Sequence, residues 1–458
     1  MKFATVLLAV CCLLSATSAQ WLETTISLPA SSWPNDLCYN PTDNKVYSAN
    51  YNIGSITVID AATNAIVATI PTAAEPSYFC YNSQGNKVYC THYSDSLVTV
   101  VHGTGDSVIT TFRAGLNASS ICYNPQDNKV YCPNSSSDSV FIVDAAADTV
   151  IAVVGTGDIP KQLCYNPTDN KVYCSNVGDR TVTVIDGAGD TVIATVAAGS
   201  APGVMVHNVL NDMVYVANAG GDSVMAIDGA ADTVIATIPT GDVPRALCFN
   251  REYNKVYCAN AGSDNISVID CATNAVIATV PAGDAPFAIL SNDVNNTVYC
   301  SNSTSDEVVV VDCAADSVIA RIACGDYASL MAHNPVQNRV YVLNIDDNSI
   351  SVIRDSMPAG VEADPTPQAA SHKPAATIVR GVLDLGVGSR QQAVDRAALS
   401  DRGRCGQLLD ATGRKVAELH PGANDVSGLA PGVYFVRVQL AVGPALSAAS
   451  SYKVVIHK

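Results

Sequence analysis

One spacing constrains this chain more than any other feature: a tyrosine recurs every 42 residues, eight times, without insertion or deletion. Each tyrosine stands in the same local sequence, of which residues 164–176 (CYNPTDNKVYCSN) are the clearest copy. The eight are Tyr47, Tyr89, Tyr131, Tyr173, Tyr215, Tyr257, Tyr299 and Tyr341. A fixed period of this length indicates one structural unit that is repeated and stacked, because so short a unit cannot bury its apolar faces alone.

Each copy contains four short segments with strand-like patterns. The Pro-Thr-Asp-Asn between the first and second segments favours a turn, since proline fixes φ and Asp and Asn form local hydrogen bonds. The third segment, such as residues 181–186 (TVTVID), alternates as a half-buried strand does. Four strands in about 40–45 residues are typical of one blade of a β-propeller.

The two ends of the array complement each other. The eighth copy stops after residues 351–354 and lacks a fourth strand, whereas residues 23–29 (ETTISLP) match the fourth strand of the other copies. We expect these two parts to pair, because an open array exposes a strand edge and two apolar faces. The sequence therefore predicts an all-β fold, an eight-bladed β-propeller closed by an N-terminal strand, with seven blades as the alternative.

The tetrapeptides that begin at the tyrosines connect the repeat to a known family. The clearest are residues 215–218 (YVAN), 257–260 (YCAN), 341–344 (YVLN) and 47–50 (YSAN). With this framework, residues 21–355 resemble the YVTN-type β-propeller family, named for a Tyr-Val-Thr-Asn signature. The resemblance implies a propeller outside the cell and no defined activity.

The N-terminus has the pattern of a secretory signal peptide. Lys2 supplies the positive start, residues 6–14 the apolar stretch, and residues 17–19 (TSA) a small-residue cleavage site. The apolar stretch is too short to span a bilayer. We therefore expect residues 1–19 to be a signal peptide, residues 20–355 the propeller, and no transmembrane segment.

The last hundred residues change in composition. Residues 356–378 are rich in Pro, Ala and Ser and are interpreted as a linker. In residues 379–458, a turn at Thr412 and Gly413 and apolar segments at 428–437 (GLAPGVYFVR) and 452–456 (YKVVI) predict a small β-sandwich. The Ala- and Ser-rich residues 441–451 are interpreted as a spacer.

Two of these segments carry a second resemblance. The Asp-x-x-Gly-Arg turn at residues 410–414 and the Gly-Val-Tyr strand after it resemble the type IX secretion C-terminal sorting domain over about residues 406–458. That resemblance implies contact with this secretion machinery and passage across an outer membrane. The chain is thus expected in the extracellular space or on the outer surface of a Gram-negative-type bacterium.

The charge excludes some partners. The chain has 25 basic and 42 acidic residues, a net charge of −17, which repels nucleic acid and anionic lipid. We expect no nucleic-acid partner.

The cysteines leave two readings open. Four copies carry a pair ten residues apart across the first hairpin, namely Cys80 and Cys90, Cys122 and Cys132, Cys164 and Cys174, and Cys248 and Cys258. In an exported protein such pairs can form disulfides. Other copies replace them with Val or Ala, which favours simple packing.

We find no catalytic motif, and we expect no cofactor and no metal site. The Ser-Asp turns at Asp95, Asp138, Asp222, Asp264 and Asp306 admit calcium, but ordinary turn chemistry also explains them. His92 and His102 share one copy, and a functional pair is the weaker reading, since both occupy framework positions.

The loop into each first strand is the best candidate for a binding site. Six copies hold a proline there, and the next two residues diverge, as an asymmetric binding mouth on a symmetric frame requires; drift of exposed loops explains this equally well. The candidate ligand-binding residues are Asp36, Tyr78, Lys161, Gln162, Arg245 and Phe287. Lys161 and Arg245 are the natural anion contacts, and Tyr78 and Phe287 the stacking surfaces.

These patterns favour a non-enzymatic surface propeller that binds a protein, glycan or small molecule or has a structural role. The alternative is a propeller enzyme, lactone hydrolase-like or quinoprotein-like, with its site in the central channel. That alternative rests on analogy of fold alone.

Overall fold

The computed structural model describes residues 20–355 with their side chains and, beyond them, the backbone of seven strands between residues 377 and 456. The chain divides into two compact units, residues 1–364 and 365–458. The expected signal peptide and most of the expected linker lie outside the described residues. Each unit is taken by itself below.

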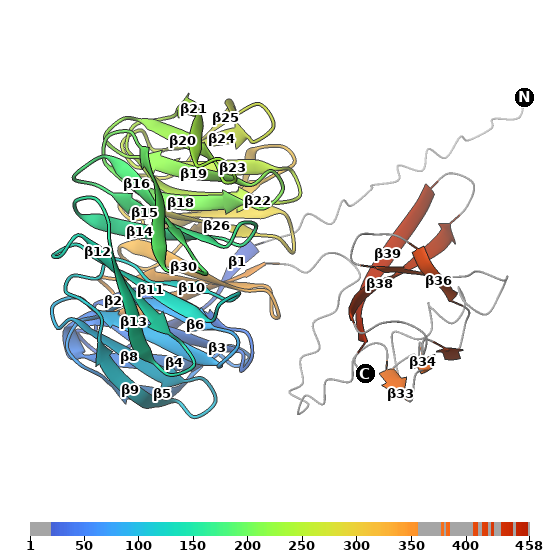
Figure 1. The fold of residues 1–458 in the computed structure, drawn as a ribbon, viewed down its shortest axis with the longest axis horizontal. Helices are drawn as coiled ribbons and strands as arrows, with labels where there is room; N and C mark the ends of the chain where they lie inside the picture. Colours follow the sequence, from blue (N-terminus) through green and yellow to red (C-terminus); the bar gives the residue numbers. More distant parts are fainter. Residues whose placement is uncertain are drawn as a thin grey trace, which may run out of the picture. The chain divides into compact units, whose positions relative to one another are not determined.

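The first unit is a ring of eight antiparallel four-stranded sheets (Figure 1). Each 42-residue repeat forms one sheet, here called blades 1 to 8 in chain order. The eight-bladed prediction is confirmed and the seven-bladed alternative is wrong.

The strands recur in the same order in every blade. The first strands are β2 (Pro34–Asn40), β6 (Pro76–Asn82), β10 (Cys122–Asn124), β14 (Pro160–Asn166), β18 (Pro202–Asn208), β22 (Pro244–Asn250), β26 (Pro286–Asn292) and β30 (Ala328–Asn334). The second strands are β3 (Lys45–Asn50), β7 (Lys87–His92), β11 (Lys129–Asn134), β15 (Lys171–Asn176), β19 (Met213–Asn218), β23 (Lys255–Asn260), β27 (Thr297–Asn302) and β31 (Arg339–Asn344).

The outer half of each blade follows the same scheme. The third strands are β4 (Ser55–Asp60), β8 (Leu97–His102), β12 (Ser139–Asp144), β16 (Thr181–Asp186), β20 (Ser223–Asp228), β24 (Asn265–Asp270), β28 (Glu307–Asp312) and β32 (Ser349–Asp355). The fourth strands are β5 (Ala65–Pro71), β9 (Ser107–Arg113), β13 (Thr149–Gly155), β17 (Thr191–Ala197), β21 (Thr233–Pro239), β25 (Ala275–Pro281), β29 (Ser317–Ala323) and β1 (Gln20–Ser27). A short 3-10 turn, η1 (Tyr51–Ile53), lies between β3 and β4.

The N-terminal strand closes the ring, as predicted. β1 pairs antiparallel with β32, so blade 8 has the order β1-β32-β31-β30, and in Figure 1 the blue β1 lies against the orange last repeat. Its apolar residues Ile26 and Leu28 are buried in the seam between blades 8 and 1. Glu23 forms ion pairs with Arg339 and Arg354 of the same blade. Closure therefore combines backbone pairing, apolar burial and charge.

The first strands surround the propeller axis. Each contacts the first strand of the next blade, and β30 contacts β2 to complete the circle. The fourth strands form the outer edge, where their side chains are largely exposed. Residues at the start of a first strand therefore lie near the axis whichever blade they come from.

The core lies between blades rather than within one. One apolar cluster, for example, joins Cys80 and Tyr89 of blade 2 to Val130 and Cys132 of blade 3. All eight repeat tyrosines are fully buried. The hydroxyl of Tyr89 donates to the carbonyl oxygen of Ala145 in the next blade at 3.2 Å. This bond explains why the repeat keeps tyrosine, because phenylalanine leaves that carbonyl without its partner.

A second set of contacts links each blade to the next. In six blades the asparagine that ends the first strand donates to a side chain 46 residues later, as from Asn40 to Asn86 at 2.9 Å. In five blades the lysine that begins the second strand forms an ion pair with an aspartate 61 residues later. One such pair joins Lys87 to Asp148 at 2.7 Å. These identical links fix the 42-residue period.

The register decides between the two readings of the cysteines. Cys164 lies opposite Tyr173, and Cys174 lies opposite Leu163. Since neighbouring residues of a strand point to opposite faces, Cys164 and Cys174 face different blades and do not form a disulfide. All cysteines in the side-chain-resolved part are free thiols. The packing interpretation is confirmed for them, and burial raises the pKa of Cys122, for example, to about 12.

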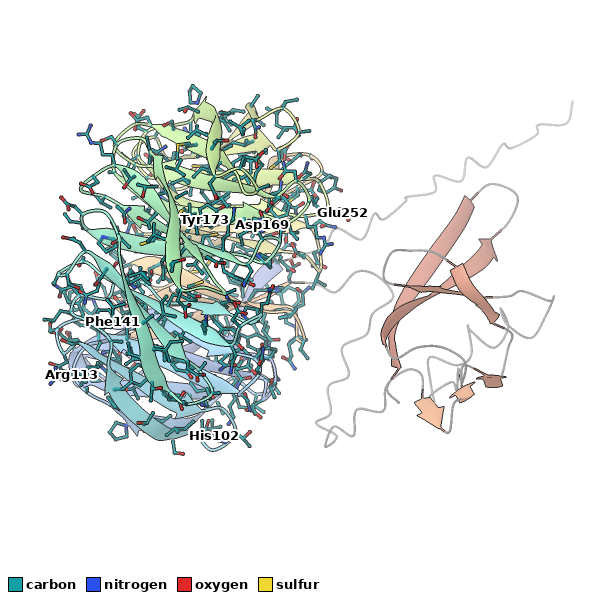
Figure 2. All side chains as sticks on the ribbon, in the orientation of Figure 1. His102, Arg113, Phe141, Asp169, Tyr173 and Glu252 are labelled. Atoms are coloured by element: carbon teal, nitrogen blue, oxygen red, sulfur yellow. The ribbon has the colours of Figure 1, made fainter. Side chains whose placement is uncertain are left out.

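The ring has two faces. Loops from fourth to first strands and from second to third strands lie on one, here called the mouth face. The turns between first and second and between third and fourth strands lie on the other, the base face. In Figure 2, Arg113 at the end of β9 and Glu252 in the turn after β22 lie on opposite sides of the ring. Gln20 and Asp355, the first and last described propeller residues, pair at the base face.

The second unit contains two antiparallel sheets. One has the order β33-β34-β37, with β33 (Thr377–Val379), β34 (Val382–Asp384) and β37 (Ala423–Asp425). The other has the order β36-β35-β38-β39, with β36 (Lys415–Leu419), β35 (Gly406–Asp410), β38 (Gly432–Val442) and β39 (Leu446–Ile456). The predicted turn at Thr412 and Gly413 lies outside the described residues, between the paired β35 and β36.

One interpretation of this region is wrong. Residues 441–451 are not a spacer, because β38 and β39 pair continuously from Gly432 with Ile456 to Val442 with Leu446. Ala and Ser have a low strand propensity, but here they form strands because β38 and β39 pair along their whole length. Among the described residues, no helix has the length and apolar character needed to cross a membrane.

Candidate functional site

The loops that enter the first strands share one unusual backbone conformation. The residue that directly precedes the first strand in seven blades, and the equivalent Asn117 in blade 3, has a positive φ, although none of the eight is glycine. They are Trp33, Glu75, Asn117, Ile159, Ala201, Val243, Ala285 and Tyr327. The two β-branched members, Ile159 at φ 55° and Val243 at φ 53°, are strained, since a branched Cβ is crowded there. We call these eight residues the rim.

The turn aspartates hold several rim residues in place. In blade 4 the backbone N–H of Ile159 donates to Asp138 Oδ1 at 3.0 Å, and its carbonyl oxygen accepts from the N–H of Val177 at 3.0 Å. Asp222, Asp264 and Asp306 accept from the next rim residue in the same way. These aspartates therefore serve as backbone anchors, and this explains them without calcium.

A bulge then turns the first strand. Seven first strands shift register just after their start, as between Pro34 and Leu37 in β2. The divergent residues lie on this bulge, and bulges often redirect side chains beside functional sites. The frame is thus the same in nearly every blade, while the side chains on it differ.

Asp36 occupies the bulge of blade 1. Its Oδ1 accepts from the N–H of Leu37 and its Oδ2 from the N–H of Phe79 in blade 2, both at 2.8 Å. Burial raises the pKa of Asp36 to about 7, and the two backbone N–H groups act in the opposite direction. Asp36 is therefore a carboxyl group that titrates near neutral pH at the junction of two blades.

Arg245 of blade 6 interacts with side chains of blades 2, 7 and 8. The guanidinium carbon of Arg245 lies 3.9 Å from the ring centroid of Phe287. Phe287 packs edge-on to Tyr327, with centroids 5.8 Å apart and an interplanar angle of 70°. Burial and the charge of Asp36 raise the pKa of Tyr78, and the positive charge of Arg245 opposes them. Because blades 2 and 6 are four repeats apart in a ring of eight, this interaction crosses the axis.

The Arg245 guanidinium is partly desolvated. Its side chain is exposed by surface area, yet the surrounding atoms lower its pKa, while Tyr327 and Tyr78 act to raise it. A cation against a ring face is stabilised by about 0.5–2 kcal/mol. The cation and the three aromatic residues are here called the Arg245 group.

Lys161 and Gln162 lie on another part of the mouth. The carbonyl oxygen of Lys161 accepts from Ser119 Oγ at 2.7 Å, and its side chain is exposed. The N–H of Gln162 donates to Ser175 Oγ at 3.2 Å. Their recorded contacts are therefore with blades 3 and 4 rather than with the Arg245 group. Of the six predicted residues, the structure brings Arg245 and Phe287 into contact, and charge effects on the pKa of Tyr78 link Tyr78 to Arg245 and to Asp36.

The sequence comparison missed the rim and Tyr327. The loop proline that identifies this position in six copies is absent from the eighth copy, which has Ala328 in its place. Trp33, Ile159, Val243 and Tyr327 are 51%, 49%, 43% and 39% exposed. Their signal is that large apolar residues directly precede a loop proline or its equivalent. Such exposed apolar side chains around polar ones often mark interaction surfaces.

The histidines of blade 2 have separate places. His92 is buried, and its ring nitrogens bond the carbonyl oxygen of Ala74 and Thr99 Oγ1, both at 2.8 Å. It thus replaces the framework asparagine, which in blade 1 bonds Ser55 and Thr57. His102 ends β8 at the base face and pairs with Lys87. Within the described residues, no three His, Cys, Asp or Glu side chains gather as metal ligands.

Comparisons with known proteins agree with this fold. A family model described as a YNCE-like beta-propeller matches residues 6–293. Among solved structures the chain is similar to Kuenenia stuttgartiensis hydrazine synthase, with a TM-score of 0.52 and 17% identity, over 64% of this chain and 99% of that one. At that identity the similarity shows the fold alone. No curated protein matches the chain significantly.

Proposed function

Since the chain belongs to the YNCE-like beta-propeller family, we propose that it is an exported cell-surface protein that binds a ligand on its mouth face. The observation that carries the proposal is the Arg245 group, in which four blades contribute different side chains to one place near the axis. An identical frame with unlike side chains is what selective binding needs, because symmetry alone offers a ligand no unique orientation.

The strained rim supports the same face. Holding a β-branched residue at positive φ costs on the order of 1–3 kcal/mol. Ile159 and Val243 both carry this cost although glycine is free of it. Their side chains are still 49% and 43% exposed, so contact with a ligand gives a reason for keeping them.

The path of the chain is compatible with this role. The described propeller begins and ends at the base face, where Gln20 pairs with Asp355. Both ends of the described propeller therefore lie on the side away from the mouth. We propose that residues 379–458 act as a type IX sorting domain and that residues 1–19 act as a signal peptide.

A ligand screen tests the binding role. The full chain is applied to arrays of glycans and peptides, alongside a rim variant with Trp33→Ser, Ile159→Asn and Tyr327→Ser. The control changes exposed apolar residues of the base-face turns, Leu210→Asn and Val336→Asn. We expect ligands that are captured by the wild type and the control and lost by the rim variant. Equal capture by both variants contradicts the proposal.

Cell fractionation tests the export role. We expect the full chain in the medium or on the outer surface, where added protease digests it. A chain without residues 379–458 is expected to stay inside the outer membrane. As a control for the segment itself, fusing residues 379–458 to an unrelated secreted protein should carry that protein out. A truncated chain that reaches the surface normally excludes the sorting role.

A further inference from the structure

Arg245 is unusual among the cations of this acidic propeller. In the described propeller most lysines and arginines form ion pairs, and Arg339, for example, pairs with Glu23. Arg245 forms no ion pair there, as is true of Arg113, Lys161, Arg180 and Arg251, but of these five cations it alone lies against an aromatic ring, that of Phe287. Partial desolvation of the guanidinium lowers the pKa of Arg245, and no protein carboxylate acts to raise it again. A carboxylate or other anion from outside supplies the missing partner.

The geometry selects the kind of anion. One face of the guanidinium is covered by Phe287 at 3.9 Å, and its edge carries the N–H donors. That edge matches a carboxylate with two parallel hydrogen bonds. A doubly charged phosphate is disfavoured for two reasons. The charge of Asp36 acts on Tyr78, a member of the Arg245 group, and the chain has a net charge of −17.

The surroundings of Arg245 select what carries the carboxylate. Phe287, Tyr78 and Tyr327 come from three blades and are partly exposed. Aromatic rings prefer edge-on or offset contacts with another flat ring. The Phe287–Tyr327 pair already shows the edge-on arrangement, at 70°. A flat ring attached to the anion can therefore join the same cluster.

We propose that the mouth binds a ligand in which a carboxylate is attached to a flat apolar ring, with Arg245 holding the carboxylate. Phe287, Tyr78 and Tyr327 contact the ring. This inference rests on the proposed binding function and adds the chemical class of the ligand.

The test uses simple probes on the full chain. Benzoate has both features, benzamide has the same shape without charge, and acetate has the charge without the ring. By ligand-observed NMR titration we expect benzoate to bind about tenfold more tightly than either, because only benzoate makes both the charge-assisted pair and the ring contact. Equal affinity for benzoate and benzamide, or no binding of benzoate, overturns the inference.

Matched variants assign the site. Arg245→Gln should weaken benzoate binding at least about tenfold and leave benzamide unchanged. Arg251→Gln is the control, because Arg251 lies in the same blade, exposed, in the base-face turn. Arg245→Lys should restore only part of the affinity, because an ammonium lacks the planar pair of donors. Benzoate binding that survives Arg245→Gln overturns the inference.

The outcome is separable from that of the proposed function. If the rim variant loses an uncharged ligand on the array and benzoate does not bind, the binding role stands and the ligand class is wrong. If benzoate binds through Arg245 and no array ligand depends on the rim, the ligand class stands and the role given to the rim in binding is contradicted.

Discussion

A natural exchange within the chain shows what the interblade ion pairs do at the scale of single residues. Met213 stands where most blades have lysine, and Asn274 stands where its aspartate partner belongs. Asn211 bonds the carbonyl oxygen of Cys271, the position that a lysine contacts elsewhere, and Tyr215 bonds Asn274. Both charges are absent together, so neither is left buried without a partner.

This exchange gives the first prediction. Lys87→Met leaves the Asp148 carboxylate, only 9% exposed, without its cation, and should reduce the free energy of unfolding by about 2–4 kcal/mol. The double variant with Asp148→Asn should recover part of that loss, because it copies Met213 and Asn274. Denaturant unfolding of both variants measures the difference. A double variant less stable than the single one refutes the compensation.

Asp36 gives a prediction about pH. Burial raises its folded pKa to about 7, above the ordinary 3.8 of the unfolded chain. The folded state then holds a proton that the unfolded state has released, so the contribution to stability is complete below about pH 4 and is lost as pH rises through 7. From pH 5 to pH 8 the wild type should lose stability relative to Asp36→Asn, by on the order of a few kcal/mol.

Unfolding midpoints of both proteins across that range give the measurement. Asp60→Asn is the control, because Asp60 lies in an exposed turn, where it accepts from the N–H groups of Ala62 and Thr63 and from the Thr63 hydroxyl. A difference between wild type and Asp36→Asn that does not change with pH contradicts the assignment.

At the residue scale, the sequence predicted the candidate residues but not their contacts. Arg245 and Phe287 were predictable because a shared proline aligned the copies, and position in the repeat is set by sequence. Their mutual contact was not, since it depends on how two blades turn toward the axis. The charge effect between Tyr78 and Arg245 crosses four blades, which no local pattern encodes.

At the scale of elements, strand identity followed from the repeat, whereas register and loop geometry did not. The alternation of residues 181–186 predicts the strand β16 (Thr181–Asp186) correctly, but half burial is wrong, because neighbouring blades cover both of its faces. The cysteine question remained open because a shift of one residue reverses the face of every side chain. Positive φ at Ile159 gave no sequence signal at all, because Asp138 and Val177 impose it from outside the loop.

This strain gives a prediction for the loop. Ile159→Gly removes the crowding at φ 55° and should raise the free energy of unfolding by about 1 kcal/mol, although glycine usually destabilises. Val153→Gly is the control, because Val153 is an exposed residue of β13 (Thr149–Gly155) without positive φ, and it should destabilise. Denaturant midpoints compare the two. If Ile159→Gly destabilises as much as Val153→Gly, the loop is not strained.

At the scale of the whole molecule, β1 (Gln20–Ser27) completes the ring. Without residues 20–28, β32 (Ser349–Asp355) loses the outer of its two partner strands, and Arg339 loses its ion pair with Glu23. The apolar seam that buries Ile26 opens as well. We expect the truncated chain to unfold at clearly lower denaturant and to aggregate, because an unpaired edge is exposed.

A peptide of residues 20–29 added to the truncated chain should restore much of the loss, and the same peptide with Ile26→Asp should not. Light scattering and unfolding midpoints follow both effects. An undiminished midpoint after truncation excludes the closing role of β1. Closure itself was predictable from sequence, because the missing strand and the surplus strand match in pattern.

Pairing the first strand with the last also sets the order of events during folding. Gln20 and Asp355 are neighbours in space but 335 positions apart in the chain. A ribosome releases residues in order, so the leading strand has no partner until the eighth repeat has been made. The circle therefore cannot lock while the chain is incomplete, and a chain that stays unlocked until synthesis ends is compatible with the proposed export.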